Sequence, residues 1–235
     1  MKNIRMQNRN TVLSWWKGDK MKDEIVKSIQ GMSGKYSPYQ IFSDWVTMSA
    51  ISIQNNCTLH KNDVWEEREK QYKDITHKYN GEEMVKFSRM FGMLVETMNK
   101  EIRDWLGEIY MESGCGNKNA GQFFTPWHIS LLNAEMSIPK DINGRITLNE
   151  PSAGGGGMIL ATAAVLKKRG INYQNTLDVV AQDLDWLAVY MCYVQLSIAG
   201  IRANVMQGSS LEELKRDKNR RKCIFETPKK AGMVI

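Results

Sequence analysis

The 235-residue chain has 42% apolar and 25% charged residues and a formal net charge of +6. This composition is typical of a globular protein and excludes a disordered or fibrous one. The apolar stretch from Met158 to Leu166 is far shorter than the roughly 20 residues that cross a bilayer, and the apolar core of a secretory signal peptide does not follow the polar amino end. We therefore expect a cytoplasmic protein with no membrane span. The four cysteines are widely spaced, which predicts free thiols, and the histidine spacing predicts no metal site.

Much of the positive charge lies near the carboxyl end. Between residues 215 and 222, six basic residues stand against one aspartate. Such a run can bind nucleic acid phosphates, but a solvated surface loop is the commoner case, and charge alone leaves both interpretations open. The candidate nucleic-acid-binding residues are Lys215, Arg216, Lys218, Arg220, Arg221 and Lys222.

The amino-terminal half has helical periodicity. Apolar residues between Glu82 and Met111 recur every three or four positions, which predicts one amphipathic helix of several turns. Apolar clusters around residues 12–16 and 41–53 predict two or three shorter helices, broken by glycines and a proline between residues 31 and 38. The segment 113–120 is rich in glycine, asparagine and serine, and we expect it to be a linker.

Beyond the linker, strand and helix patterns alternate. The expected strands are Arg145–Leu148, Thr176–Ala181 and Arg202–Met206, and the expected helices between them are Gly157–Arg169 and Trp186–Ala199. This order predicts a parallel sheet with right-handed crossovers. The fold class is therefore α/β, with a helical region over residues 1–112, a linker over 113–120 and a partial Rossmann-like domain over 121–235.

The strongest chemical signal is a glycine-rich turn after the first expected strand. Residues 149–158 are Asn-Glu-Pro-Ser-Ala-Gly-Gly-Gly-Gly-Met. Glycines let the backbone approach a ligand closely, and free amides at a helix amino terminus favour anionic groups, as a nucleotide-like ligand requires. The glycines could instead serve only a tight turn. Because no Gly-Lys-Ser/Thr follows, a nucleotide triphosphatase is disfavoured.

A carboxylate ends the second expected strand. Asp183 lies 29 residues beyond Gly154. An acid at the tip of that strand can accept both hydroxyls of a ribose. Alone, Asp183 could equally be the N-cap of the helix that begins near Trp186, but its pairing with the glycine turn favours the ribose interpretation.

Three motifs follow one another along the chain: Gly-Gln-Phe-Phe-Thr-Pro ending at Pro126, the glycine turn, and Gln-Asp-Leu-Asp ending at Asp185. Together they resemble the motifs of the adenine-N6 DNA methyltransferases. Residues 104–110, Asp-Trp-Leu-Gly-Glu-Ile-Tyr, also resemble the family segment that leads into the first motif, so the similarity covers about residues 84–211. The motifs are most similar to those of the modification subunit of type I restriction systems.

The resemblance implies a Rossmann-like methyltransferase domain that binds S-adenosylmethionine. The first motif would close over the methionine end of the cofactor, and the glycine turn would hold its amino-acid part. The acid after the second strand would hold the ribose, and the leucine beside it would lie against the adenine ring. For the two phenylalanines, plain core packing stays open. The residues so implied are Gln122, Phe123, Phe124, Thr125, Pro126, Glu150, Pro151, Gly154, Gly155, Gly156, Asp183 and Leu184.

The sequence also departs from the family pattern. Family members carry Asn or Asp, Pro-Pro and an aromatic residue after the fourth strand, where these groups bind the flipped base. None of the five prolines here is adjacent to another, and Phe225-Glu-Thr-Pro lacks the paired prolines and the following aromatic residue. Ser209 replaces an acid that would contact the cofactor's adenine. We expect three strands where a complete domain has about seven, and assign no catalytic residue.

Two functions are compatible with these observations. The first is a DNA adenine-N6 methyltransferase of the type I kind, with S-adenosylmethionine as cofactor, DNA and a specificity or second modification subunit as partners, and the missing loop supplied by another chain. The second is a non-catalytic cofactor-binding module that engages DNA or a restriction-modification partner. The absence of the Pro-Pro-aromatic loop favours the second.

Overall fold

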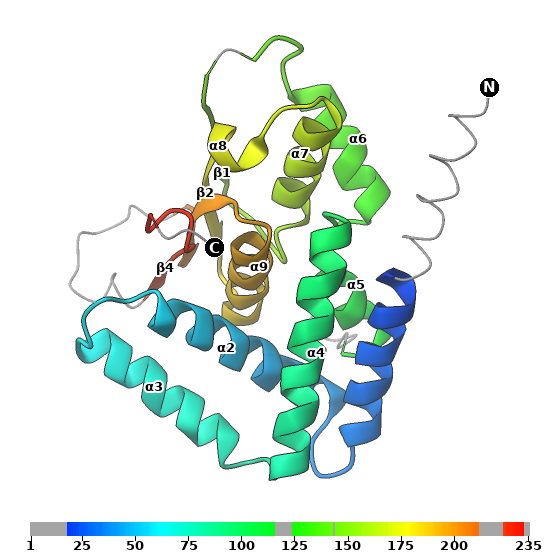
Figure 1. The fold of residues 1–235 in the computed structure, drawn as a ribbon, viewed down its shortest axis with the longest axis vertical. Helices are drawn as coiled ribbons and strands as arrows, with labels where there is room; N and C mark the ends of the chain where they lie inside the picture. Colours follow the sequence, from blue (N-terminus) through cyan, green and yellow to red (C-terminus); the bar gives the residue numbers. More distant parts are fainter. Residues whose placement is uncertain (1–17, 116–123, 143, 212–222, 233–235) are drawn as a thin grey trace.

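The computed structural model describes residues 18–115, 124–142, 144–211 and 223–232 (Figure 1). A helix covers residues 18–32. The further helices are α2 (Pro38–Asn56), α3 (Asp63–Thr76), α4 (Gly81–Lys100), α5 (Trp105–Glu112), α6 (Trp127–Ser137), α7 (Gly157–Lys168), α8 (Tyr173–Thr176) and α9 (Trp186–Ile198). The strands are β1 (Ile146–Glu150), β2 (Leu177–Asp183), β3 (Arg202–Gln207) and β4 (Ile224–Glu226). None of the described helices is long and apolar enough to span a membrane.

The sheet confirms the predicted α/β fold. Its order is β1-β2-β3-β4, and the first three strands are parallel, with Leu148 opposite Val179 and Val179 opposite Ala203. The expectation of only three strands is wrong, because β4 pairs antiparallel with β3 through Phe225 and Val205. A strand of three residues is too short to show a periodic pattern.

The two faces of the sheet differ in burial. Val179, Ala181, Ala203 and Val205 are fully buried on the face that α9 covers. The side chains that alternate with them are exposed or half-buried in β1 and over most of β2 and β3, as the pattern of intermediate residues in β2 and β3 shows. Parallel strands normally bury both faces, so this sheet is covered mainly on one side within the described residues.

The helices that flank the parallel strands begin and end close to their predicted bounds. α7 starts after Gly156, whose φ is +92°, and ends at Lys168, with Gly170, whose φ is +76°, following its C-cap Arg169. Three cations, Lys167, Lys168 and Arg169, lie at its carboxyl end, where their positive charges interact favourably with the negative end of the helix dipole. α9 begins after the N-cap Asp185, and Gly200 follows its carboxyl end.

The expected single helix over residues 82–111 is wrong. The first part of this segment is α4, which begins with a capping box formed by Asn80 and Glu83. The chain then becomes extended at Glu101, with φ −143° and ψ 127°. α5 starts separately, because the Asp104 side chain caps it by accepting the Gly107 N–H at 3.0 Å. Apolar spacing alone cannot reveal this break, since both helices bury the same periodic face.

The helical half packs against the α/β half. α2 lies against both α3 and α9, and Figure 1 shows it crossing beside α9. The Arg68 guanidinium on α3 donates to the Ile224 carbonyl of β4 at 3.0 Å. One cluster of buried side chains contains Trp45 and Trp105 as well as Val179. The division at residues 112 and 120 stays a prediction, and most of the expected linker lies outside the described residues.

Candidate functional site

The glycine turn lies at the carboxyl end of β1, and two of its glycines have conformations or neighbours that exclude larger residues. Gly154 has φ +51°, and a Cβ there would lie 3.2 Å from Cδ1 of Phe124. Gly156 has φ +92°, and its Cβ would lie 3.2 Å from Sγ of Cys192. The turn therefore needs glycine for its backbone conformation as well as for close approach.

Asp183 binds the glycine turn directly. Its Oδ2 accepts the Gly154 N–H at 2.8 Å, and its Oδ1 accepts the Asp185 N–H at 3.0 Å. The interpretation of Asp183 as the N-cap of α9 is wrong, because Asp185 caps that helix by accepting the Leu187 N–H at 3.1 Å. A carboxylate has about four acceptor positions, so Asp183 can still accept two hydroxyl groups.

A cavity of about 90 Å³ opens at the turn. The N-cap of α7, Gly156, has no side chain to satisfy the first amides of the helix, which are therefore suited to an anionic group. No lysine or arginine lines the cavity among the described residues. Its lining consists of Asp104, Phe124, Thr125, Ser152, Ala153, Gly154, Gly155, Gly157 and Met158.

The structure describes only part of the first predicted motif. Phe124 is half-buried, and its ring packs edge-on against Tyr110 with the centroids 5.3 Å apart, beside Gly154. Thr125 lines the cavity, whereas Pro126 is exposed at the start of α6. Phe124 therefore packs against the helical half and also bounds the cavity. Gln122 and Phe123 lie outside the described residues.

The remaining predicted cofactor residues surround the same strand ends. Glu150 is half-buried at the end of β1. Burial and the negative charge of Asp183 raise the pKa of the Glu150 carboxyl, and the hydrogen bond from the Ser152 N–H offsets part of this rise. Pro151 is exposed, and the side chain of Leu184 is 68% exposed. The basic residues 215–222 lie outside the described residues. The chain therefore brings the glycine turn, Glu150, Asp183 and Leu184 together.

Two buried residues at the turn were not predicted, Asp104 and Gln195. The Gln195 side chain is fully buried, and its Nε2 donates to Asp104 Oδ1 at 2.8 Å and to the Gly155 carbonyl at 2.7 Å. Its Oε1 accepts the Leu106 N–H at 3.0 Å. One amide thus joins α5, the glycine turn and α9. The available signals were the position of Asp104 at the start of the family-like segment 104–110 and a glutamine near the end of a largely apolar helix.

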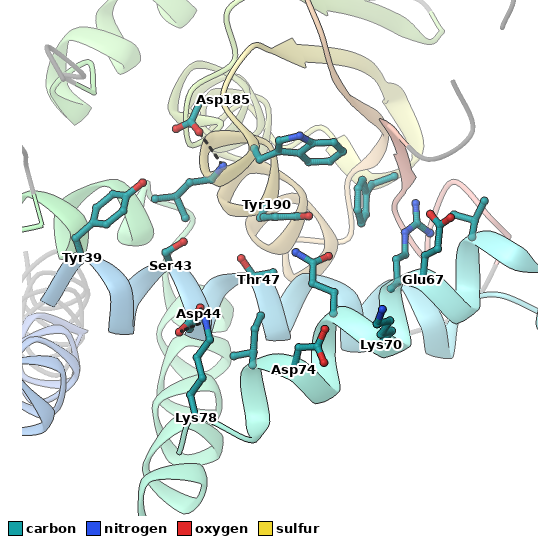
Figure 2. Close-up of a pocket in the computed structure, with 17 residues that line it drawn as sticks. Tyr39, Ser43, Asp44, Thr47, Glu67, Lys70, Asp74, Lys78, Asp185 and Tyr190 are labelled. Carbon is teal, nitrogen blue, oxygen red and sulfur yellow. Dashed lines mark hydrogen bonds and ion pairs between the residues drawn. The ribbon is translucent and has the colours of Figure 1, made fainter. Parts of the chain in front are cut away.

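A second, larger cavity of about 800 Å³ lies between α2, α3, the start of α9 and β4 (Figure 2). Tyr190 and Trp186 bound one side, with ring centroids 5.5 Å apart. Asp44 lies on α2, and Lys78 reaches it from beyond the end of α3, as Figure 2 shows. Asp185 also lines this cavity, so the loop after β2 lies between it and the glycine turn.

Comparison with solved structures shows a similar fold. A protein from Listeria monocytogenes, described as a class I S-adenosylmethionine-dependent methyltransferase, aligns with TM-score 0.50 and 15% identity over 85% of this chain and 56% of its own. The type I restriction-modification system methyltransferase subunit from Streptococcus thermophilus aligns with TM-score 0.44 and 10% identity over 87% of this chain and 61% of its own. The chain thus spans less than two thirds of either protein.

Comparison with curated proteins gives no match. The family model described as N-6 DNA methylase matches residues 102–234, which is more than half of the chain. The match begins and ends later than the expected similarity over residues 84–211, and it includes α5 and β4 as well as the whole parallel sheet. On the strength of this match, the chain belongs to the N-6 DNA methylase family.

Proposed function

We propose that this chain binds S-adenosylmethionine and forms part of a DNA adenine-N6 methyltransferase of the type I modification kind. The observation that carries the proposal is the hydrogen bond from the Gly154 N–H to the Asp183 carboxylate, 2.8 Å long. It joins the glycine turn and the strand-end acid into one site at the carboxyl ends of parallel strands, where nucleotide-like ligands bind in such sheets. Family membership supports adenine in DNA as the substrate.

The residues present fit this cofactor. A Cβ at Gly154 would touch Phe124, so the turn is a cradle that a larger residue would fill. Asp183 would accept the two ribose hydroxyls, the exposed Leu184 would offer an apolar surface to the adenine ring, and the free amides of α7 would hold the cofactor's carboxylate. Phe124 and Thr125 line the same cavity. When bound, S-adenosylmethionine supplies an electrophilic methyl group.

The groups that hold the target adenine come from another polypeptide segment in this proposal. No Asn-Pro-Pro-aromatic or Asp-Pro-Pro-aromatic sequence occurs between residues 1 and 235. The partners are DNA and a specificity subunit or a second modification subunit, and the compartment is the cytoplasm. The same sequence observation favours the second candidate, a cofactor-binding module that does not itself transfer the methyl group.

Calorimetry tests cofactor binding. Asp183→Ala removes the ribose acceptor, and Gly154→Val forces a branched side chain into a turn with φ +51°. Both should weaken binding of S-adenosylmethionine at least tenfold, since each removes or displaces a charged hydrogen-bond acceptor. Asp178→Ala, at the opposite end of β2, is the matched control and should bind as the wild type does. A wild-type chain that binds no S-adenosylmethionine would contradict the proposal.

Methyl transfer separates the two candidate functions. The purified chain is incubated with tritiated S-adenosylmethionine and DNA, alone and with the candidate partner subunits. Label that enters adenine only when a partner is present supports the split site. Label that enters adenine with the chain alone rules out the non-catalytic module and the need for a loop from another chain. Cofactor binding without transfer under every condition favours the module.

The basic segment is tested through the salt dependence of DNA binding. Replacing Arg220, Arg221 and Lys222 by Ala should weaken DNA affinity and reduce the slope of log K against log salt by roughly 0.9 for each phosphate that is no longer neutralised. The control replaces Lys86 and Arg89, exposed cations on α4. Equal slopes in the wild type and the triple variant would identify the segment as a solvated loop.

A further inference from the structure

Asp104 is a buried carboxylate with no cationic partner among the residues that the structure describes. The residue is only 4% exposed. Oδ1 accepts the Gly107 N–H at 3.0 Å and Gln195 Nε2 at 2.8 Å, and none of the ion pairs among the described residues includes Asp104. Burying a charge without an opposite charge costs several kcal/mol, so a carboxylate in this position calls for an explanation.

The carboxylate faces the glycine turn. A Cβ built on Gly155 would lie 3.2 Å from Asp104 Oδ1, and one built on Gly157 would lie 3.0 Å from Oδ2. Asp104 also lines the 90 Å³ cavity at the turn. Gln195 binds both the Asp104 carboxylate and the glycine turn, because its Nε2 also donates to the Gly155 carbonyl at 2.7 Å. The carboxylate and the turn are therefore held at a fixed separation.

The surroundings of the cavity are negatively charged. Asp104, Asp183 and Glu150 all contribute to raising the pKa of the buried Cys192 thiol, after burial itself. Burial raises the pKa of Asp104, and the hydrogen bonds from Gln195 and Gly107 lower it only in part. Within the described residues, no group of three or more acidic, histidine or cysteine side chains is arranged to hold a metal ion. This arrangement suits an organic cation.

We propose that Asp104 binds the α-ammonium group of the amino-acid portion of S-adenosylmethionine, while the free amides of α7 take its carboxylate. This assignment rests on the proposed function. The two charged ends of an amino acid then meet opposite charges on two sides of one cavity: the carboxylate of the residue that caps α5 and the positive end of the α7 dipole.

A purely structural role for Asp104 makes a different prediction. As N-cap of α5, Asp104 needs only a side-chain oxygen, and asparagine is as good a cap as aspartate. Asp104→Asn therefore keeps the cap and removes the charge. Asp104→Ser does the same with a smaller side chain and serves if the Asn variant folds poorly. The matched control is Asp44→Asn, because Asp44 is also 4% exposed and lies away from the turn.

The experiment measures binding of two ligands by calorimetry: S-adenosylmethionine and the analogue in which hydrogen replaces the α-amino group. We expect Asp104→Asn to weaken S-adenosylmethionine binding by about 10- to 100-fold and to leave binding of the analogue unchanged. The wild type should bind the analogue more weakly than S-adenosylmethionine by a similar factor. This comparison tests the assignment without any substitution in the protein. Asp44→Asn should change neither affinity.

The outcomes separate the inference from the proposed function. Equal weakening of both ligands by Asp104→Asn would assign Asp104 a structural role, and unchanged binding of S-adenosylmethionine would overturn the assignment altogether. Equal binding of the two ligands by the wild type would also overturn it. A wild-type chain that binds neither ligand contradicts the proposed function itself.

Discussion

Asp44 and Asp104 are equally buried, at 4% exposure, yet their surroundings differ. In the helical half, Lys78 Nζ lies 3.2 Å from both oxygens of Asp44, and the Tyr79 hydroxyl donates to it at 2.9 Å. At the glycine turn, Asp104 receives two N–H groups and no cation within the described residues. The surroundings of Asp44 thus neutralise a buried charge, whereas the carboxylate of Asp104 beside the glycine turn keeps a negative charge that a cationic ligand would complement.

The largest effect is expected from Gln195→Leu. The substitution leaves the Leu106 N–H and the Gly155 carbonyl without their partner and takes one of the two donors from Asp104. We expect the free energy of unfolding to fall by about 3–5 kcal/mol, measured by urea denaturation. Gln40→Leu, which removes one of several donors to Asp44, should cost under about 1 kcal/mol. Similar losses for the two variants would mean that the two aspartates are held alike.

Asp44→Asn should be the next most destabilising change. The substitution removes the negative charge that pairs with Lys78 and that accepts the hydrogen bond from the Tyr79 hydroxyl as a carboxylate. We therefore expect the free energy of unfolding to fall by about 2 kcal/mol. Asp104→Asn in the ligand-free chain should cost less, because it removes an uncompensated charge. Chemical denaturation of both variants checks this order, and a larger loss for Asp104→Asn would break the comparison.

Gly156→Ala tests how rigidly the turn is packed. We expect a loss of about 2 kcal/mol, because alanine is strained at φ +92° and its Cβ would press on the Cys192 sulfur. Gly170→Ala is the control for backbone strain alone: its φ is +76°, but nothing lies within 4 Å of the added Cβ. Its loss should be about 1 kcal/mol. Equal losses of stability in the two variants would show that the Cys192 side chain moves to make room for the added Cβ.

The smallest effect is a difference in pH dependence. Because burial raises the pKa of Asp104 above its ordinary value of 3.8, the folded chain binds a proton there more tightly than the unfolded chain. The contribution of Asp104 to stability is thus fully present below pH 3.8 and is lost as the pH rises through the raised pKa. The wild type should lose stability relative to Asp104→Asn over that interval, as unfolding curves at several pH values would show. A constant difference between the two proteins would contradict the raised pKa.

Local sequence patterns were sufficient to predict the parallel sheet and the glycine turn. The three parallel strands, α7 and α9 each combine a periodic apolar pattern with clear end signals, such as Gly170 and Gly200 after the helices. The break between α4 and α5 was missed because it depends on Asp104, whose side chain serves a long-range network as well as a local cap.

The candidate site could be predicted only where its residues are close in sequence or belong to a known motif. Glu150 and the glycines are close together in the chain, and Asp183 ends the next strand. Gln195 lies 89 residues from its partner Leu106, so no local pattern connects them. A parallel sheet was predicted, but the antiparallel strand β4 was not, and β4 contacts the distant helix α3, where the Arg68 guanidinium donates to the Ile224 carbonyl.

The strand order has a consequence for where a further strand could contribute to this site. Among the described strands, β1, which carries the glycine turn, lies at one edge of the sheet, and β4 lies at the opposite edge. Neighbouring strands lie about 4.8 Å apart, so a strand added beyond β4 would lie roughly 19 Å from β1. A strand added parallel to β1 would instead bring its carboxyl-terminal loop directly beside Gly154. Growth of the sheet at the β1 edge would therefore bring a second polypeptide segment closer to the cavity than growth beyond β4.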